Sequence, residues 1–170
     1  MSQLHKKEAP KSITCKIITV SDTRTEETDK SGRLMRDFLE RNHHQVNAYE
    51  IVRDEYKEIQ KAIERGIEQE GIEAILLNGG TGIAKRDVTI EVVNNMLEKE
   101  MPGFGEIFRM LSFQEDIGSA AILSRATAGV IRNKTIFATP GSSGAVQLAM
   151  DRLIIPELGH VMREIYKDIK

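Results

Sequence analysis

Apolar residues along the chain alternate between two spacings, one typical of buried strands and the other typical of amphipathic helices. Runs rich in β-branched residues are followed by stretches in which apolar side chains recur every three or four positions. The predicted elements of the first half are a strand at 13–20, a helix at 28–41, a strand at 46–52, a helical stripe at 59–67 and a strand at 74–77. Strands that alternate with helices predict right-handed crossovers and a mainly parallel sheet, as in α/β folds.

The second half of the chain is less regular. Helical spacing is expected over 88–97 and again over 104–113. Two short strands are expected around an Asn133-Lys134 turn. The glycine-rich stretch 140–144 then turns the chain into a helix, and a second helix is expected after Pro156.

Length and composition favour one compact domain. With 170 residues, 40% of them hydrophobic, the chain can bury one substantial core, which we assign to 13–170. Residues 1–12 are mostly polar and include Pro10, so we expect them to form a flexible arm. The single Cys15 lies in an apolar run, which excludes an intramolecular disulfide and predicts a buried thiol.

Charge and hydropathy restrict the partners. The 24 basic and 26 acidic residues leave a formal net charge of -2, so we expect no general attraction to nucleic acid or to an anionic membrane. No apolar stretch approaches the length of a membrane span, and the first residues lack the apolar core of a signal peptide, so a cytoplasmic protein is expected. Histidines without metal-ligand spacing are predicted to lie on the surface, namely His5, His43, His44 and His160.

The most informative segment follows the third predicted strand. Residues 78–89 read Asn-Gly-Gly-Thr-Gly-Ile-Ala-Lys-Arg-Asp-Val-Thr. Gly79, Gly80 and Gly82 permit positive φ, and exposed N–H groups around Thr81 can form a nest for an oxyanion such as phosphate. The segment lacks the Gly-Lys-Ser/Thr ending of a P-loop and the glycine spacing of a dinucleotide fold. A purely structural turn uses the same residues and remains the alternative.

Polar loops follow several predicted strands, and in a parallel sheet such loops meet at one edge. The loops concerned are Ser21-Asp22-Thr23, Asp54-Glu55, the glycine segment through Asp87, and Gly141-Ser142-Ser143. Because Mg²⁺ takes one or two protein carboxylates together with phosphate oxygens, Asp54 and Asp87 are the predicted metal ligands. Arg86 and Arg125 are candidates for stabilising negative charge.

Each of these residues also has a structural explanation. Asp54 and Asp87 precede predicted helices and can cap them, which is worth about 1 kcal/mol each. Asp22 can form an Asx turn, and Ser142-Ser143 suits a helix N-terminus. An arginine such as Arg125 can simply reach solvent.

Four motifs combine in a recognisable order and spacing. They are Val20-Ser21-Asp22, then Asn78-Gly-Gly-Thr-Gly with Arg86-Asp87-Val88-Thr89, then Leu123-Ser124-Arg125, then Pro140-Gly141-Ser142 with Ala145-Val146. Together they resemble the MoaB/MogA family of molybdenum cofactor biosynthesis proteins, which is related to the G domains of gephyrin and its plant counterpart. The similarity extends from about Ile13 to the C-terminus.

The resemblance implies a three-layer α/β/α fold, assembly into trimers or hexamers, and binding of the pterin dithiolene molybdopterin. Active family members use Mg²⁺ and ATP to adenylylate the terminal phosphate of molybdopterin. Asp54 and Asp87 match the two catalytic aspartates of the family. The substrate-binding residues implied by position are Ser21, Asp22, Gly79, Gly80, Thr81, Gly82, Arg86, Ser124, Arg125, Gly141, Ser142 and Ser143.

Two departures make the sequence more MoaB-like than MogA-like. Lys85 stands where many members have proline before Arg-Asp, and Ser142-Ser143 replaces the more common Asn-Pro or Gln-Pro pair. Because some MoaB members bind without adenylylating, two functions stay open, a molybdopterin adenylyltransferase and a non-catalytic molybdopterin-binding or carrier protein. A plain sugar-phosphate or nucleotide binder is a third possibility.

Overall fold

From residue 14 onward, strands and helices alternate as the first half of the sequence predicts. The structure, a computed structural model, describes residues 7–169. Its strands are β1 (Thr14–Val20), β2 (Gln45–Val52), β3 (Ala74–Asn78), β4 (Lys99–Glu100), β5 (Thr127–Ile131) and β6 (Lys134–Thr139). Its α-helices are α2 (Lys30–Arg41), α3 (Tyr56–Glu68), α4 (Thr89–Met96), α5 (Pro102–Glu115), α6 (Ser143–Ala149) and α7 (Ile155–Tyr166). A 3₁₀-helix, η1 (Gly118–Leu123), follows α5, and a π-helical turn, η2 (Met150–Ile154), follows α6.

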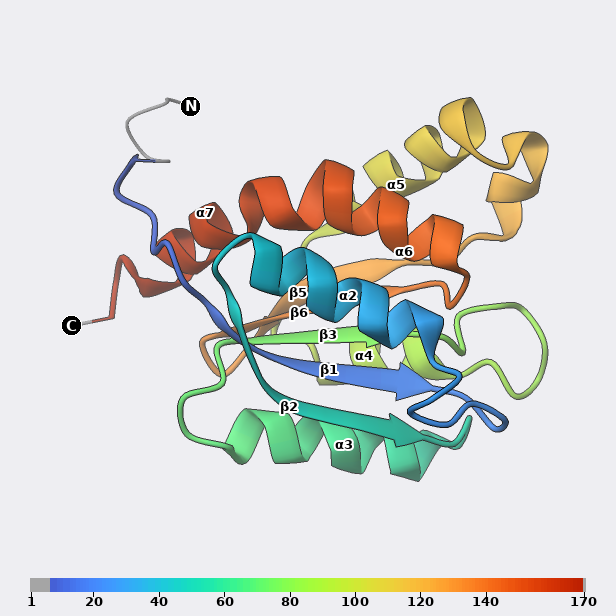
Figure 1. Cartoon of the computed structure of the whole chain (residues 1–170), viewed down its shortest axis with the longest axis horizontal. Helices are drawn as coiled ribbons and strands as arrows, with labels where there is room; N and C mark the ends of the chain where they lie inside the picture. Colours follow the sequence, from blue (N-terminus) through green and yellow to red (C-terminus); the bar gives the residue numbers. More distant parts are fainter. Residues whose placement is uncertain (1–6, 170) are drawn as a thin grey trace.

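The strands form one sheet in the order β2-β1-β3-β6-β5-β4 (Figure 1). β2, β1, β3 and β6 run parallel, whereas β5 and β4 pair antiparallel at the far edge. The register places Thr19, Asn78 and Thr139 side by side at the carboxyl ends of β1, β3 and β6. The loops that follow these strands therefore leave the sheet at one edge, where open α/β sheets bind ligands.

Helices cover both faces of the sheet, which confirms the three-layer α/β/α prediction (Figure 1). α2, α5, α6 and α7 pack on one face around Phe108, and α3 and α4 pack on the other around Ile63. Neighbouring side chains of β1 pack on opposite faces of the sheet: Ile17 belongs to the core cluster around Phe108, and Ile18 belongs to the cluster around Ile63. This alternation follows from the two-residue period of a strand and explains why β1 is apolar on both sides.

The helix predicted after Pro156 is not separate. α6 continues through η2 into α7, and Pro156 lies in the first turn of α7. Proline lacks a backbone N–H and disrupts a regular α-helix, but the wider π-helical turn just before it lets the chain continue. Met150 and Ile154 in this turn are fully buried, so the turn is part of the core cluster to which α2 also contributes.

The surface prediction is wrong for His44. Its side chain is buried, and its Nδ1 accepts a hydrogen bond from the Ile13 N–H at 3.0 Å. Burial lowers the pKa of His44, which favours the neutral acceptor form. His43 is exposed, whereas His160 is half-buried beside Glu157, and His5 lies outside the described residues.

The buried thiol predicted for Cys15 is confirmed. Its side chain has no exposed surface, and burial, with a smaller contribution from the negative charge of Glu73, raises its pKa to about 12. A thiol with so high a pKa stays protonated at neutral pH and is a poor nucleophile. Cys15 therefore serves packing.

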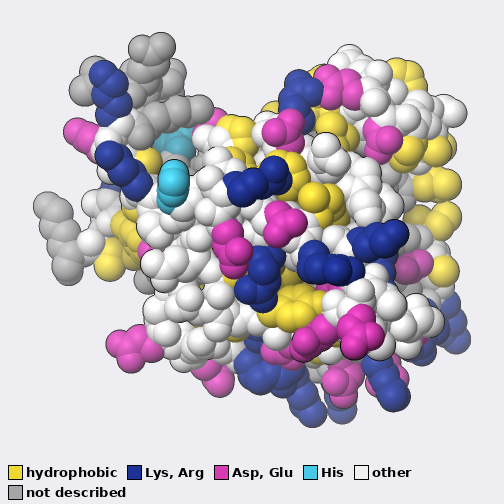
Figure 2. Space-filling model, in the orientation of Figure 1, with side chains coloured by type: hydrophobic (Ala, Val, Ile, Leu, Met, Phe, Trp, Pro, Cys, Tyr) yellow, Lys and Arg dark blue, Asp and Glu magenta, His cyan; other side chains and the backbone are white. Residues whose placement is uncertain are grey.

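The described part of the N-terminal arm lies against α7. Glu8 pairs with Arg163 at 2.8 Å, and a Cβ added to Gly159 would lie 2.8 Å from the Pro10 carbonyl oxygen. Residues 1–6 of the expected arm lie outside the described residues, and the flexibility of the arm stays a prediction. The surface shown in Figure 2 intersperses acidic and basic side chains, in keeping with the small net charge. Within residues 7–169, no helix combines the length and apolarity needed to cross a bilayer.

The core cluster on the α5 face gives a stability test. Phe108 is fully buried, and its ring lies 6.4 Å from that of Phe104. We expect Phe108→Ala to lower the free energy of unfolding by about 3–5 kcal/mol, because it removes buried apolar surface and leaves a cavity. Gln114→Ala in the same helix is the control: this side chain is exposed and lies outside the core, so the change should stay within about 0.5 kcal/mol. Equal losses in urea denaturation would contradict the assignment of the core.

Candidate functional site

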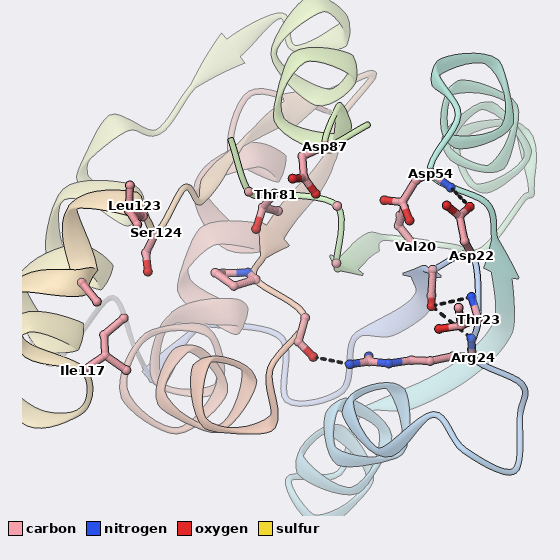
Figure 3. Close-up of a pocket in the computed structure, with 17 residues that line it drawn as sticks. Val20, Asp22, Thr23, Arg24, Asp54, Thr81, Asp87, Ile117, Leu123 and Ser124 are labelled. Carbon is pink, nitrogen blue, oxygen red and sulfur yellow. Dashed lines mark hydrogen bonds between the residues drawn. The ribbon is translucent and has the colours of Figure 1, made fainter. Parts of the chain in front are cut away.

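A cavity of about 650 Å³ opens at the carboxyl edge of the parallel strands (Figure 3). The cavity brings together ten of the residues named from the sequence, namely Ser21, Asp22, Asp54, Gly79, Gly80, Thr81, Gly82, Asp87, Ser124 and Gly141. They come from the loops after β1, β2, β3 and β6 and from the end of η1. Four named residues do not line the cavity: Arg86, Arg125, Ser142 and Ser143. The cavity also includes residues that the sequence reasoning did not name as binding residues, among them Thr23, Arg24, Ile117, Leu123 and Pro140.

The glycine loop passes so close to neighbouring groups that side chains are excluded at two positions. At Gly79, where φ is 96°, an added Cβ would lie 2.2 Å from the Val20 carbonyl oxygen. At Gly80, where φ is 66°, it would lie 2.7 Å from an Asp54 carboxylate oxygen and 2.4 Å from the Thr89 hydroxyl. Both positions therefore require glycine on conformational and steric grounds. The loop therefore presents its backbone, and no side chain, to Asp54.

Hydrogen bonds fix the start of this loop and leave its centre open. The Thr89 hydroxyl donates to the Gly79 carbonyl at 2.8 Å, and the Thr89 N–H donates to the Gly80 carbonyl at 3.0 Å. Among residues 7–169, no acceptor takes the N–H groups of Gly80, Thr81 or Gly82. Successive amides without an internal acceptor, at the edge of a cavity, are suited to binding an oxyanion.

Arg125 holds the far side of the glycine loop. Its Nε donates to the Thr81 carbonyl at 3.0 Å, and its Nη2 donates to the Gly82 carbonyl at 2.6 Å. The same guanidinium forms an ion pair with Glu91 of α4. Arg125 therefore does not extend freely into solvent, and it does not line the cavity. It orients the glycine loop by donating hydrogen bonds to the carbonyl oxygens of the loop.

The helix-capping explanations of the two aspartates are wrong. The N-cap residue of α3 is Glu55 and that of α4 is Val88, and neither helix has a side-chain cap. The Asp87 carboxylate instead accepts the Ala84 N–H at 3.0 Å, within its own loop. Asp54 points its carboxylate toward the cavity (Figure 3).

Two neighbouring carboxylates, Asp22 and Asp87, affect the ionisation of Asp54. Burial raises the pKa of Asp54, and the negative charges of Asp22 and Asp87 raise it further. Asp22 has a lowered pKa, first because it accepts the Asp54 N–H at 3.1 Å and also because Arg86 pairs with it at 2.8 Å. Arg86 thus neutralises Asp22, which leaves Asp54 and Asp87 as the carboxylates that a cation would stabilise.

The donor set fits a magnesium ion only if a ligand supplies further oxygens. Within residues 7–169, no group of three or more histidine, cysteine or acidic side chains is arranged to hold a metal. Mg²⁺ commonly binds through one or two carboxylates plus phosphate oxygens and water. Asp54 and Asp87 would supply the two carboxylates of such a site, and the phosphate oxygens and water would complete the coordination. The backbone of Gly80 lies close to Asp54, so a phosphate on the glycine loop would also be close to the metal.

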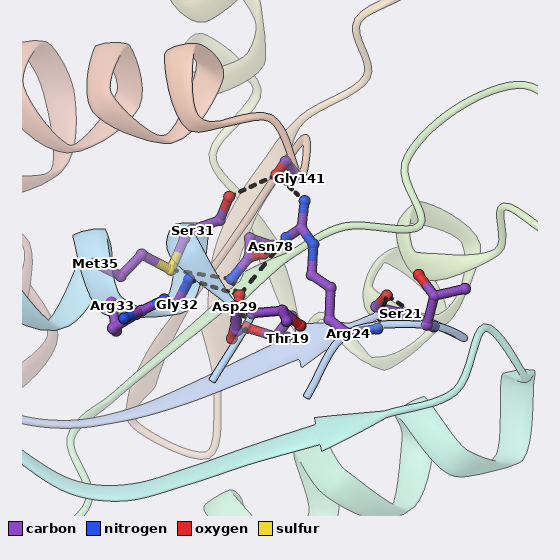
Figure 4. A network of polar contacts seen from close by, with 12 residues as sticks. Thr19, Ser21, Arg24, Asp29, Ser31, Gly32, Arg33, Met35, Asn78 and Gly141 are labelled. Carbon is purple, nitrogen blue, oxygen red and sulfur yellow. Dashed lines mark hydrogen bonds and ion pairs between the residues drawn. The ribbon is translucent and has the colours of Figure 1, made fainter. Parts of the chain in front are cut away.

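A buried polar network behind the cavity was missed by the sequence reasoning (Figure 4). Asp29 has no exposed surface and caps α2 by accepting the Gly32 N–H at 2.9 Å. Its carboxylate also accepts the hydroxyl groups of Thr19 at 2.6 Å and Tyr49 at 2.5 Å. Asn78 then donates to the Thr19 hydroxyl at 2.9 Å. An aspartate before a helical run is an N-cap signal, but its contacts with β1 and β2 depend on the fold.

The loop after β6 is held by the same region of the molecule. The Gly141 carbonyl accepts hydrogen bonds from Ser31 at 2.6 Å and from Arg24 at 2.8 Å. Ser142 caps α6 by accepting the Ala145 N–H at 3.2 Å, which confirms its structural explanation, and Ser143 is the first residue of that helix. The loop therefore presents Gly141, not the serines, to the cavity.

Comparison with known proteins is decisive at this point. Residues 16–160 match the model of a family described as a probable molybdopterin-binding domain. The chain belongs to this family. It is 65% identical over 166 residues to molybdenum cofactor biosynthesis protein B of Bacillus subtilis (strain 168), with 98% of each chain covered. It is 66% identical over 164 residues to the protein of the same name from Halalkalibacterium halodurans, with 96% of each chain covered.

Solved structures of family members share the fold. A crystal structure of a molybdenum cofactor biosynthesis protein B has a TM-score of 0.92 at 56% identity and covers 95% of this chain and 100% of its own. The tungsten cofactor synthesizing protein MoaB from Pyrococcus furiosus has a TM-score of 0.83 at 37% identity, with coverage of 92% and 99%. The MoaB-like resemblance is therefore confirmed.

The raised pKa of Asp54 predicts a pH-dependent cost in stability. As pH rises above about 3.9, the usual aspartate value, the unfolded chain ionises before the folded one, so the folded state loses stability through this window. We expect Asp54→Asn to raise the free energy of unfolding at pH 7 and to leave it unchanged at about pH 2.5, where both states carry the neutral acid. Urea denaturation at the two pH values measures the difference.

The control for this measurement is Asp37→Asn, an exposed aspartate of α2. It should have little effect at either pH. An Asp54→Asn protein no more stable than the parent at pH 7 would show that neither burial nor the charges of Asp22 and Asp87 penalise the ionised form of Asp54.

Proposed function

We propose that the protein acts in molybdenum cofactor biosynthesis, binding molybdopterin in the cavity and adenylylating its terminal phosphate with Mg-ATP. One observation carries the proposal: Asp54 and Asp87, which follow different strands, face the same cavity as the open amides of the glycine loop. Family membership and the names of the relatives support molybdopterin as the ligand. The carboxylates and the anion cradle support a phosphate-transfer reaction.

The glycine loop supplies the anion cradle. The N–H groups of Gly80, Thr81 and Gly82 are available to a phosphate, and the bonds from Thr89 and Arg125 keep the loop from rearranging around it. A preorganised site of this kind lowers the barrier by holding the reacting oxygen in line with its target.

The reaction joins the phosphate of the pterin to the α-phosphorus of ATP. A terminal phosphate oxygen of molybdopterin forms the new P–O bond, the bond between the α-phosphorus and the bridging oxygen breaks, and pyrophosphate leaves. Mg²⁺, when bound, would neutralise phosphate charge at this centre. Asp54 and Asp87 would hold it, while Arg86 keeps Asp22 neutralised and the glycine loop fixes the attacking phosphate.

Assembly and cellular context stay part of the proposal. Exposed apolar side chains gather on α5, on η1 and on the turn between them, namely Ile107, Met110, Phe113, Ile117, Ile122 and Leu123. They suit the expected trimer or hexamer, because contiguous apolar surface favours association. Action in the cytoplasm, without nucleic acid or membrane as a partner, is proposed from charge and hydropathy.

Turnover with molybdopterin, ATP and Mg²⁺ tests the function. We expect pyrophosphate release that requires all three and stops when the metal is chelated. Asp54→Asn and Asp87→Asn should each reduce the rate about 100-fold or more, because each removes a charge from the reacting centre. Asp37→Asn should keep the parent rate, since this residue lies on the exposed side of α2.

The other functions give different results in the same assay. Tight molybdopterin binding without pyrophosphate release in a single turnover would establish the non-catalytic carrier instead. Competition by simple phosphates together with indifference to the pterin would identify a plain phosphate or nucleotide binder. Either result would overturn the proposed adenylyl transfer.

A further inference from the structure

Arg24 is the positively charged side chain of a cavity whose other charges are carboxylates. Among the described residues that line the cavity, the charged ones are Asp22, Asp54, Asp87 and Arg24. Figure 3 shows Asp54 and Asp87 along one side and Arg24 along the opposite side, extended toward the loop after β6. The cavity therefore has an acidic side suited to a cation and a basic side suited to an anion.

The contacts of Arg24 hold its guanidinium in place without using all its donors. Nη2 donates to the Gly141 carbonyl at 2.8 Å, and Nη1 lies 3.5 Å from the Asn78 side-chain oxygen and 3.6 Å from Asp29. A guanidinium has five N–H groups, and within residues 7–169 Nε has no acceptor. The side chain is 31% exposed, so the remaining donors are available to a ligand.

Pairing with Asp29 does not account for this position. The two oxygens of Asp29 already accept hydrogen bonds from Gly32, Thr19 and Tyr49 at 2.5 to 2.9 Å. The contact with Arg24 is longer, at 3.6 Å, and is too long for a direct hydrogen bond. Asp29 orients the arginine electrostatically while its hydrogen-bonding capacity is met elsewhere.

We propose that Arg24 binds a phosphate oxyanion in the cavity, and that this phosphate belongs to the pterin substrate and not to the nucleotide. The guanidinium lies beside Gly141, where an added Cβ would be 3.1 Å from the Gly79 Cα and 3.8 Å from Arg24 Nη1. Arg24 is thus at the base of the glycine loop, across the cavity from Asp54 and Asp87. A nucleotide that arrives with its cation matches the acidic side, and a metal-free phosphate ester matches the basic side.

The identity of the ester rests on the proposed function, whereas phosphate binding by Arg24 can be measured alone. Inorganic phosphate and Mg-ATP are the two probes, titrated by calorimetry into the full-length protein. We expect Arg24→Gln to raise the Kd for phosphate by about tenfold or more and to reduce its dependence on salt, because a charge-assisted contact is lost. The Kd for Mg-ATP should change by less than about twofold, because the nucleotide binds on the other side.

Two variants serve as controls. Arg24→Lys keeps the charge but not the fork of donors, so it should restore part of the phosphate affinity. Arg33→Gln removes the same charge from the exposed side of α2 and should leave both Kd values unchanged. Thermal unfolding of each variant shows that the fold is retained.

Two kinds of outcome would overturn the inference, and a third would separate it from the proposed function. Phosphate binding that is absent in the parent, or unchanged in a folded Arg24→Gln protein, would leave Arg24 with only a structural role. Weaker Mg-ATP binding with unchanged phosphate binding would assign Arg24 to the nucleotide. An Arg24-dependent phosphate site in a protein that releases no pyrophosphate would instead support the inference while the proposed adenylyl transfer fails.

Discussion

A fully buried carboxylate, Asp29, fixes the geometry on which the site depends. It caps α2 and accepts hydrogen bonds from hydroxyl groups of β1 and β2. Thr19 of β1 in turn accepts a hydrogen bond from Asn78 at the end of β3. Burial of an ionised group is costly unless hydrogen bonds compensate, and here three donors satisfy it. Because the donors come from separate strands and from a helix, any shift of these elements would break the compensation. The network therefore sets the relative positions of the strand ends from which the loops of the cavity emerge.

The glycine loop is built by a different principle. Its backbone has positive φ at Gly79 and Gly80, a conformation that glycine adopts readily but does not prefer, so contacts with other residues must hold the loop in place. Thr89 fixes its first carbonyl oxygens and Arg125 fixes later ones, which leaves the intervening amides directed elsewhere. Because Thr89 and Arg125 donate hydrogen bonds to the carbonyl oxygens, the loop keeps a conformation in which its N–H groups remain available to a ligand. A partly buried arginine is well suited to this task, because its planar guanidinium can donate to several acceptors at once.

The sequence predicted those parts of the structure that depend on local pattern. Alternating strands and helices, the glycine loop and the polar residues after each strand were recoverable, because periodicity and turn residues are local signals. Contacts between segments far apart in the sequence could not be predicted in this way. His44 is buried where it accepts a hydrogen bond from the Ile13 N–H. Pro156 continues a helix because the π-helical turn η2 directly precedes it. Arg24 carries no motif of its own, and only the position of Gly141, far along the chain, makes it part of the cavity.

The carboxylates in this cavity lower the stability of the fold. Burial raises the pKa of Asp54 and the charges of Asp22 and Asp87 raise it further, which penalises its ionised form, while Arg86 pairs with Asp22. A core selected for stability alone would separate these groups, and a site that must hold a cation beside a phosphate keeps them together. Arg24 on the opposite side offsets none of this repulsion by direct contact, since its short hydrogen bond goes to Gly141. Acidic and basic groups that stay apart in one cavity are stabilised most when a ligand of mixed charge bridges them, and the proposed phosphate ester with a metal–nucleotide complex has that mixed charge.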